Sequence, residues 1–65
     1  MNWDQIEGNW RSVKGKFREK WGRLTEDDLE VSEGRRERIV GKLQARYGDA
    51  KHIVEQKVDD FIDAL

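Results

Sequence analysis

The chain has no cysteine and no proline among its 65 residues. Without cysteine it can form neither a disulfide nor a thiolate metal site, which suits a reducing compartment. Without proline it has no strong helix breaker. No apolar run is long enough to span a membrane, and the segment from Met1 to Asp4 is unlike the start of a signal peptide. We therefore expect a cytoplasmic protein that does not insert into a membrane.

Charged side chains are abundant instead. They make up 42% of the chain, against about 25% in an average globular protein, and the mean hydropathy is -1.02. Disordered chains combine such a composition with a high net charge and few aromatic residues. Here the net charge is only -1 and there are three tryptophans. The composition therefore predicts one folded, hydrophilic domain over residues 1–65.

Apolar residues in the first half follow the period of an amphipathic helix. Their spacing predicts a helix over about residues 3–21, ending at Gly22 with a positive φ. Thr25 then suits the N-cap of a short helix over about 26–32, in which Leu29 and Val31 should face inward. The predicted stripe of the first helix consists of Trp3, Ile6, Trp10, Val13, Phe17, Trp21 and Leu24.

The second half predicts two further helices. One should begin near Gly34 and end before Gly48, and the other should follow Asp49 as its cap and reach about residue 64. Short loops should join all the elements. The predicted buried positions are Ile39, Val40, Leu43 and Tyr47 in the third helix, and Ile53, Val54, Val58, Phe61, Ile62 and Leu65 in the fourth.

The chain contains an internal repeat. Residues 15–22 and 41–48 share the pattern Gly-Lys-apolar-x-x-basic-aromatic-Gly at an offset of 26 residues. All six glycines fall into two series with a spacing of seven. The repeat predicts an all-α, pseudo-duplicated fold of four helices in two hairpins, over about 3–32 and 34–64. Neither hairpin can bury its apolar stripe alone, so the two should pack together.

Charge follows the repeat. Lysine and arginine dominate residues 11–23 and 34–46, whereas aspartate and glutamate dominate 24–33 and 47–65. The favoured interpretation is that these charges neutralise one another within the fold. The alternative is that the two basic helices bind nucleic acid, which requires free cations that displace counterions from phosphate. Neighbouring acidic segments and a pI near 5.8 argue against that alternative.

Three glycines lie inside predicted helices, opposite the apolar stripe. An interior glycine lowers helix stability by about 0.8–1 kcal/mol relative to alanine. Two explanations are open: close approach by a neighbouring helix or partner molecule, or a domain that is weakened so that it opens easily. With the basic residues nearby, they form a candidate interaction face of Gly8, Gly15, Gly41, Arg11, Lys14, Lys16, Arg35, Arg36 and Lys42.

Side chains for catalysis or metal binding are sparse. His52 is the only histidine and has no second ligand or nucleophile to serve. The adjacent acid pairs 27–28 and 59–60 point about 100° apart on a helix and do not form a dyad. Helix N-terminal charge explains the first pair, and a solvated face the second. No phosphate-binding glycine loop is present. We therefore expect no cofactor, no metal and no enzymatic activity.

The motifs resemble those of the CsbD-like family of bacterial stress-associated proteins over about residues 5–61. That resemblance implies a four-helix fold of two orthogonally packed hairpins, similar to the sterile-alpha-motif-like group, and expression under general stress. It carries over no catalytic residue. The matching motifs are Gly8-Asn9-Trp10, Lys14-Gly15-Lys16, Trp21-Gly22-x-Leu24-Thr25-x-Asp27-Asp28-Leu29 and Val40-Gly41-Lys42-Leu43-Gln44-x-Arg46-Tyr47-Gly48.

Residues and resemblance together predict a non-enzymatic bacterial general stress response protein. It would act as a small hydrophilic protective module or as a protein-interaction module, with a protein partner or a second copy of itself. The alternative function is nucleic-acid binding through the basic helices.

Overall fold

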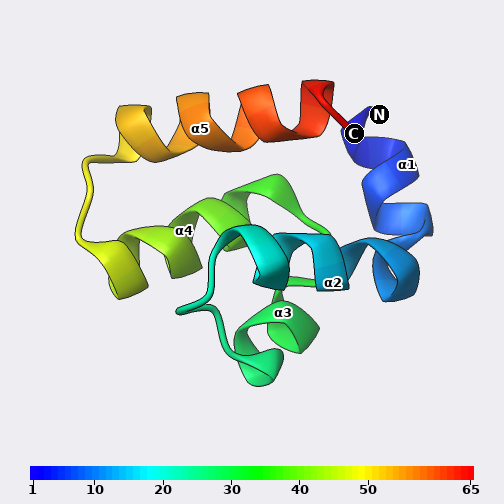
Figure 1. The fold of residues 1–65 in the computed structure, drawn as a ribbon, viewed down its shortest axis with the longest axis horizontal. Helices are drawn as coiled ribbons and strands as arrows, with labels where there is room; N and C mark the ends of the chain where they lie inside the picture. Colours follow the sequence, from blue (N-terminus) through cyan, green and yellow to red (C-terminus); the bar gives the residue numbers. More distant parts are fainter.

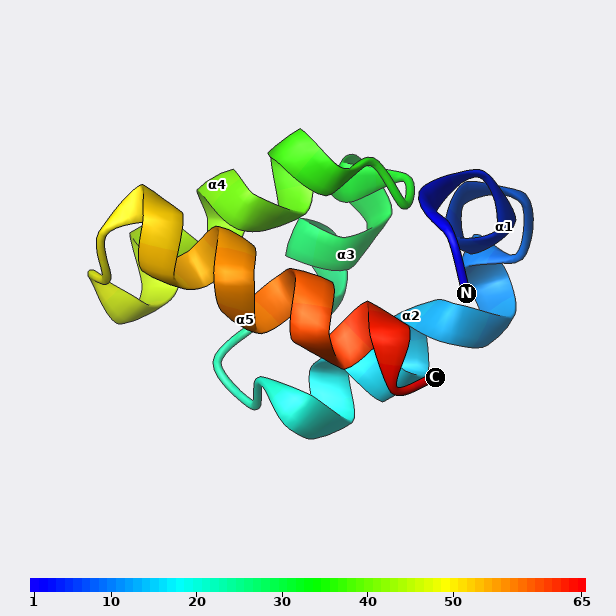
Figure 2. The same ribbon diagram turned by 90° about the horizontal axis from the view of Figure 1, so that it is seen from above.

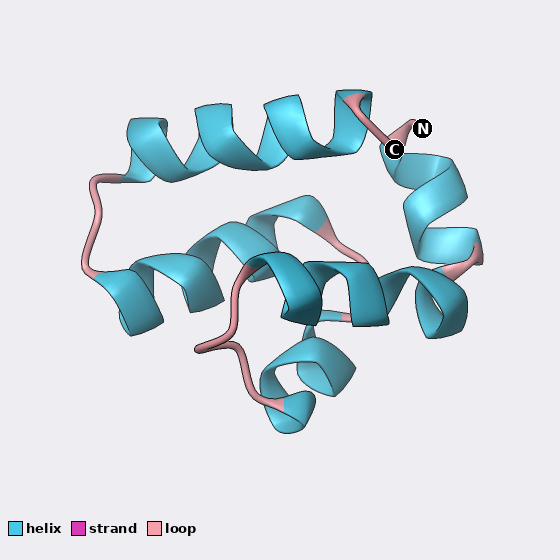
Figure 3. Cartoon of the chain, viewed as in Figure 1, coloured by secondary structure: helices cyan, strands magenta, loops and turns pink.

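The computed structural model describes all 65 residues, and every regular element is a helix (Figures 1 and 3). The predicted all-α class is confirmed, but the predicted count of four helices is wrong because there are five. The helices are α1 (Trp3–Gly8), α2 (Trp10–Lys20), α3 (Glu26–Ser32), α4 (Arg36–Tyr47) and α5 (Lys51–Asp63).

The extra helix arises because the predicted helix over 3–21 is interrupted at Asn9. This residue has φ -113° and ψ 24°, outside the helical range. Its backbone N–H and its side-chain amide both donate to the Gln5 carbonyl, at 3.0 and 3.1 Å. The backbone bond is the last of the α1 ladder, and the side-chain bond is of the local kind by which asparagine competes with a helix. The axis of α1 therefore turns away from that of α2 (Figure 1).

Two of the predicted helix ends are confirmed. The Thr25 hydroxyl accepts the Asp28 N–H at 3.0 Å and starts α3. Gly48 ends α4 with φ 75°, in the left-handed region that glycine adopts without a Cβ clash.

Two other helix ends were predicted wrongly. Gly22 has no positive φ, because the turn after α2 is made at Trp21 with φ -119°. Asp49 does not cap α5, whose N-cap is Ala50 without a side-chain bond. The Asp49 carboxylate instead lies 3.6 Å from the Lys57 amine, which takes it away from the free N–H groups of the helix.

The helices α4 and α5 run antiparallel, side by side, as expected for the second hairpin (Figures 1 and 2). Helix α3 packs against both α2 and α4, so it is not confined to the first hairpin. The two chain ends lie close together, and the Met1 amino group donates to the Ile62 carbonyl at 3.4 Å. The orthogonal packing of a sterile-alpha-motif-like fold stays a prediction.

The core follows the predicted stripes. Phe17 is fully buried at its centre, and its ring centroid lies 5.3 Å from Trp10 and 5.1 Å from Phe61. Val31 and Ile53, both predicted to face inward, are exposed. Helix α3 buries positions 28, 29 and 32, so Val31 lies on the other side of that helix. The buried apolar residues are Ile6, Val13, Phe17, Trp21, Leu24, Leu29, Ile39, Val40, Leu43, Val54, Val58 and Ile62.

Candidate functional site: ion-paired surfaces and an open groove

The predicted glycine face is open. No atom beyond the local helix lies within 4 Å of the place that a Cβ would take at Gly8, Gly15 or Gly41. Close approach by a neighbouring helix, one of the predicted explanations, is therefore wrong for these three. Close approach occurs instead at Gly34, where φ is 77° and a Cβ would lie 2.9 Å from the Glu7 Cα. Glu7 of α1 therefore lies against the loop that contains Gly34.

A buried carboxylate joins α3 to α4. The Asp28 side chain is 3% exposed and accepts two hydrogen bonds from the Arg46 guanidinium, at 2.8 and 3.0 Å. It also accepts the Thr25 N–H at 3.1 Å, which completes a capping box. The Lys42 amine lies 3.9 Å from the same carboxylate. These contacts give the buried charge the partners that it needs.

The pairing changes the protonation of Asp28. The hydrogen bonds from Arg46 hold the pKa of this carboxyl well below its usual range and raise the pKa of Arg46. The sequence interpretation took residues 27 and 28 together as helix N-terminal charge and missed Arg46. The spacing Thr25-x-x-Asp28 was a signal that could have separated the two acids.

A second ion-paired cluster joins the start of α4 to α5. Arg36 donates to both carboxylate oxygens of Asp59, at 3.0 and 2.9 Å, and to Glu55 at 3.1 Å. These bonds raise the pKa of Arg36, and they lower the pKa of Asp59. The prediction that Asp59 lies on a plain solvated face is wrong, because a bidentate pair holds it against α4.

Two more of the predicted cations are paired. Lys14 bonds to Glu26 at 2.8 Å and also to Glu30, both on α3, and these hydrogen bonds raise its pKa. Arg35 lies 3.6 Å from Glu7. Of the six basic residues in the predicted face, four are therefore engaged within the chain, and the nine residues do not act as one free surface.

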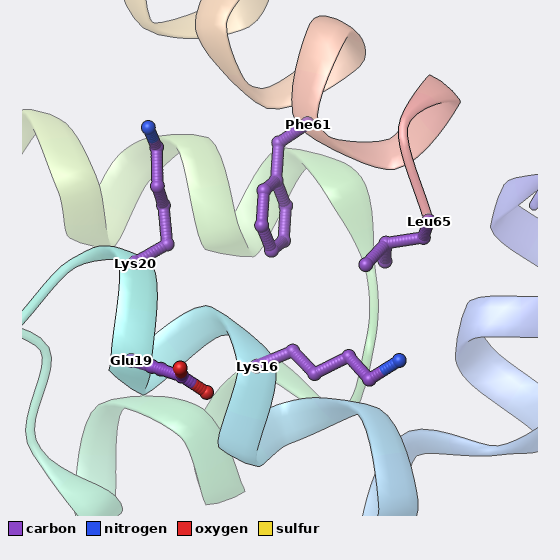
Figure 4. Close-up of a pocket in the computed structure, with 5 residues that line it drawn as sticks. All are labelled: Lys16, Glu19, Lys20, Phe61 and Leu65. Carbon is purple, nitrogen blue, oxygen red and sulfur yellow. The ribbon is translucent and has the colours of Figure 1, made fainter.

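Three of the five cations without an ion pair lie on α2, and the other two are Arg23 and Lys51. Arg11 and Lys16 belong to the predicted face, and Lys20 was not included in it. Lys16 and Lys20 border a groove of about 400 Å³ between α2 and the end of α5. Figure 4 shows the Phe61 ring pointing from α5 toward α2, with the two lysines extending to either side of it. The groove is lined by Lys16, Glu19, Lys20, Phe61 and Leu65.

No group of three or more histidine, aspartate or glutamate side chains is arranged to hold a metal ion. His52 lies exposed near the start of α5. No helix combines the length and the apolar character that crossing a membrane requires.

Comparison with known proteins decides the family. A profile described as CsbD-like matches residues 4–56. The chain belongs to the CsbD-like family. The UPF0337 protein RPA4217 of Rhodopseudomonas palustris is 55% identical over all of this chain and 98% of its own length. The UPF0337 protein PA4738 of Pseudomonas aeruginosa is 52% identical over the whole of both chains. No solved structure matches.

A third relative, the UPF0337 protein YjbJ of Escherichia coli K12, is 49% identical over 94% of this chain and 88% of its own length. The segment that matches the CsbD-like profile includes Asp28 with its partners and the α2 side of the groove. It ends before Phe61, so the α5 side of the groove lies outside it. The predicted family membership is confirmed.

Proposed function

We propose that this CsbD-like chain is a non-enzymatic stress response protein of bacteria, which acts as a small hydrophilic module in contact with other proteins. The observation that carries this proposal is a surface rich in ion pairs and poor in exposed apolar side chains. Ten contacts between oppositely charged groups involve residues of all five helices and their connecting turns. Only Met1, Val31 and Ile53 expose a large apolar side chain substantially.

Such a surface suits a protective role for a physical reason. Large exposed apolar patches drive proteins to associate, whereas a hydrated surface of mixed charge keeps denaturing neighbours apart. The fold contains no disulfide and no cluster of side chains arranged to hold a metal ion. The surface also offers the groove beside Lys16 for a specific protein contact. The proposal needs no catalytic group.

The test is to heat or dry an aggregation-prone enzyme with and without an equal mass of this protein. We expect less light scattering and more recovered activity than with an unrelated, weakly charged helical protein of similar size. Equal aggregation in the two samples would contradict the protective role. A deletion strain that survives drying and osmotic stress as well as its parent would contradict the stress role.

Nucleic-acid binding is the second candidate, and the free cations of α2 favour it. Arg11, Lys16 and Lys20 have no ion pair and could contact phosphates. Against it, Lys14 and Arg36 are held by carboxylates. Titration with labelled DNA and RNA at low salt decides between the two. Saturable binding that weakens steeply with salt would support this candidate, and no binding at about 50 µM protein would exclude it.

A further inference from the structure

Each copy of the internal repeat contains two basic residues four positions apart. Only one of these two basic pairs has a carboxylate as its partner. At the offset of 26 residues, Lys16 corresponds to Lys42 and Lys20 to Arg46. Lys42 and Arg46 lie against α3, where both meet Asp28. The residue that corresponds to Asp28 is Val54, a buried apolar residue of α5. The first basic pair therefore has no acidic partner at the corresponding position.

The structure places this unpartnered pair beside an apolar surface. Lys16 and Lys20 lie across the groove from Phe61 and Leu65, which are both only half-buried (Figure 4). Neither lysine is within 4.0 Å of a carboxylate. The groove thus combines two free ammonium groups with an apolar floor. Its complement is a short segment that carries a carboxylate next to an apolar side chain.

The outer face of α3 has this chemistry. Val31 is 49% exposed, and Asp27 lies one turn earlier on the same side of the helix. Asp27 is exposed and has no ion pair. Glu30 adds a further carboxylate, which is bonded to Lys14 of its own chain. An acidic helical face with an exposed valine is therefore present on every copy of the protein.

We propose that the groove of one copy binds the outer face of α3 of a second copy. Asp27 of the second copy supplies the carboxylate that the first repeat lacks, and Val31 covers Phe61 and Leu65. This inference rests on the proposed function as an interaction module and names a partner for it. In Figure 1, α3 lies at the bottom and α5 at the top. The two surfaces are different, so the contact is heterologous and leads from copy to copy, head to tail.

The first test is the mass in solution, measured by sedimentation equilibrium. We expect the average mass of the full chain to rise above that of a monomer between about 10 µM and 1 mM, which is the range of weak interfaces, and to fall when salt screens the lysines. The double variant Lys16→Glu/Lys20→Glu should stay monomeric. The matched control is Arg11→Glu, which removes a free cation of α2 outside the groove and should associate like the wild type.

Glu19 gives a test in the opposite direction. Its carboxylate lies on the α2 side of the groove, where its negative charge would repel an acidic partner. Glu19→Gln should therefore associate at lower concentration than the wild type. A wild type that stays monomeric at 1 mM and low salt would overturn the proposal, and so would association that the lysine reversals leave unchanged. Circular dichroism of each variant should match that of the wild type, which checks that the variants are folded.

Mixing two variants tests the head-to-tail geometry. The variant Asp27→Asn/Val31→Ser keeps its groove, whereas Lys16→Glu/Lys20→Glu keeps its α3 face. Each should be monomeric alone, and an equimolar mixture should form a heterodimer and nothing larger. A mixture that stays monomeric would overturn this contact.

The outcomes separate this inference from the proposed function. A monomeric protein that still protects enzymes would overturn self-association alone. An associating protein that protects nothing would overturn the protective role in the proposed function and would leave self-association standing.

Discussion

The two repeats have the same order of elements but different partners for their charges. Helices α2 and α4 begin 26 residues apart, at Trp10 and Arg36. Each is followed by a helix, but α3 has 7 residues and α5 has 13. In the second repeat Arg46 meets a buried carboxylate, whereas Lys20 in the first has none. The comparison teaches that the repeated pattern sets the helices, while single residues at corresponding positions decide which charges are satisfied.

The glycines differ between the repeats in the same way. Gly8 and Gly34 correspond, but only Gly34 has a positive φ and a neighbour within 4 Å. Gly22 and Gly48 correspond, but only Gly48 ends its helix in the left-handed region. Equal spacing in the sequence thus conceals different local needs, and substitutions within these two pairs of glycines should have unequal effects.

The largest expected effect is at Gly34. Gly34→Ala should lower the free energy of unfolding by about 3 kcal/mol, because alanine is strained at this φ and its Cβ meets the Glu7 backbone. Urea unfolding measures the change. The matched control is Gly8→Ala, where the space is open and we expect no loss. Equal losses at the two positions would show that the repeats do not differ here.

The next largest effect on stability should come from Arg46, compared with the corresponding Lys20 of the first repeat. Arg46→Met should lower the free energy of unfolding, because it leaves the Asp28 charge buried with fewer partners. Lys20→Met removes a cation without an ion pair and should change stability by less than about 0.5 kcal/mol. Thermal unfolding of both variants compares them. A large loss with Lys20→Met would reveal a partner that the folded chain does not show.

The pH dependence of the unfolding stability should come mainly from the aspartates that form ion pairs. The folded-state pKa of Asp28 is lowered, so its contribution is complete above the ordinary aspartate pKa of about 3.9 and is lost as the pH falls below that value. The urea midpoint of the wild type should therefore begin to drop near about pH 5 and should continue to fall below about pH 3, toward the lowered folded-state pKa of Asp28.

The control for this dependence is Asp28→Asn, which should be less stable than the wild type at neutral pH and should lose less stability on acidification. Asp59, whose pKa is also lowered by Arg36, accounts for part of the remaining loss. Parallel curves for the wild type and Asp28→Asn would contradict the assignment.

The smallest effects are at the open glycines. Gly15→Ala and Gly41→Ala should each raise the free energy of unfolding by about 0.8–1 kcal/mol, because alanine favours the helix and meets no neighbour. The melting temperature should rise by about 4–8 °C for each. Here the repeats should behave alike. A fall at one position would show that something packs against that face in solution.

Much of the fold could be predicted from local patterns. The 3–4 spacing identified the buried face of α2, α4 and most of α5, because a helix places such residues on one side. Thr25 and Gly48 could be assigned because a cap depends on a few neighbouring residues. The break at Asn9 was missed because the apolar spacing continues through it, and a bond to one carbonyl decides it.

The candidate site was only partly predictable. The sequence indicated a basic, glycine-bearing face, but not that Lys14, Arg35, Arg36 and Lys42 find carboxylates while Lys16 and Arg11 do not. Those pairs join residues up to 28 positions apart, and the helical pattern contains no information about such distances. The end of α5 beside Lys20 was missed for the same reason.

The sequence by itself determined the helical class, the family, the apolar faces and the alternation of charge, because all of these depend on residue type and on spacing within one element. Only the tertiary structure decided which glycine is crowded, which aspartate is buried and which lysines stay free. Those outcomes depend on how separate helices meet, because the partner of a charged side chain, such as Arg46 of α4 for Asp28 of α3, lies on another element of the fold.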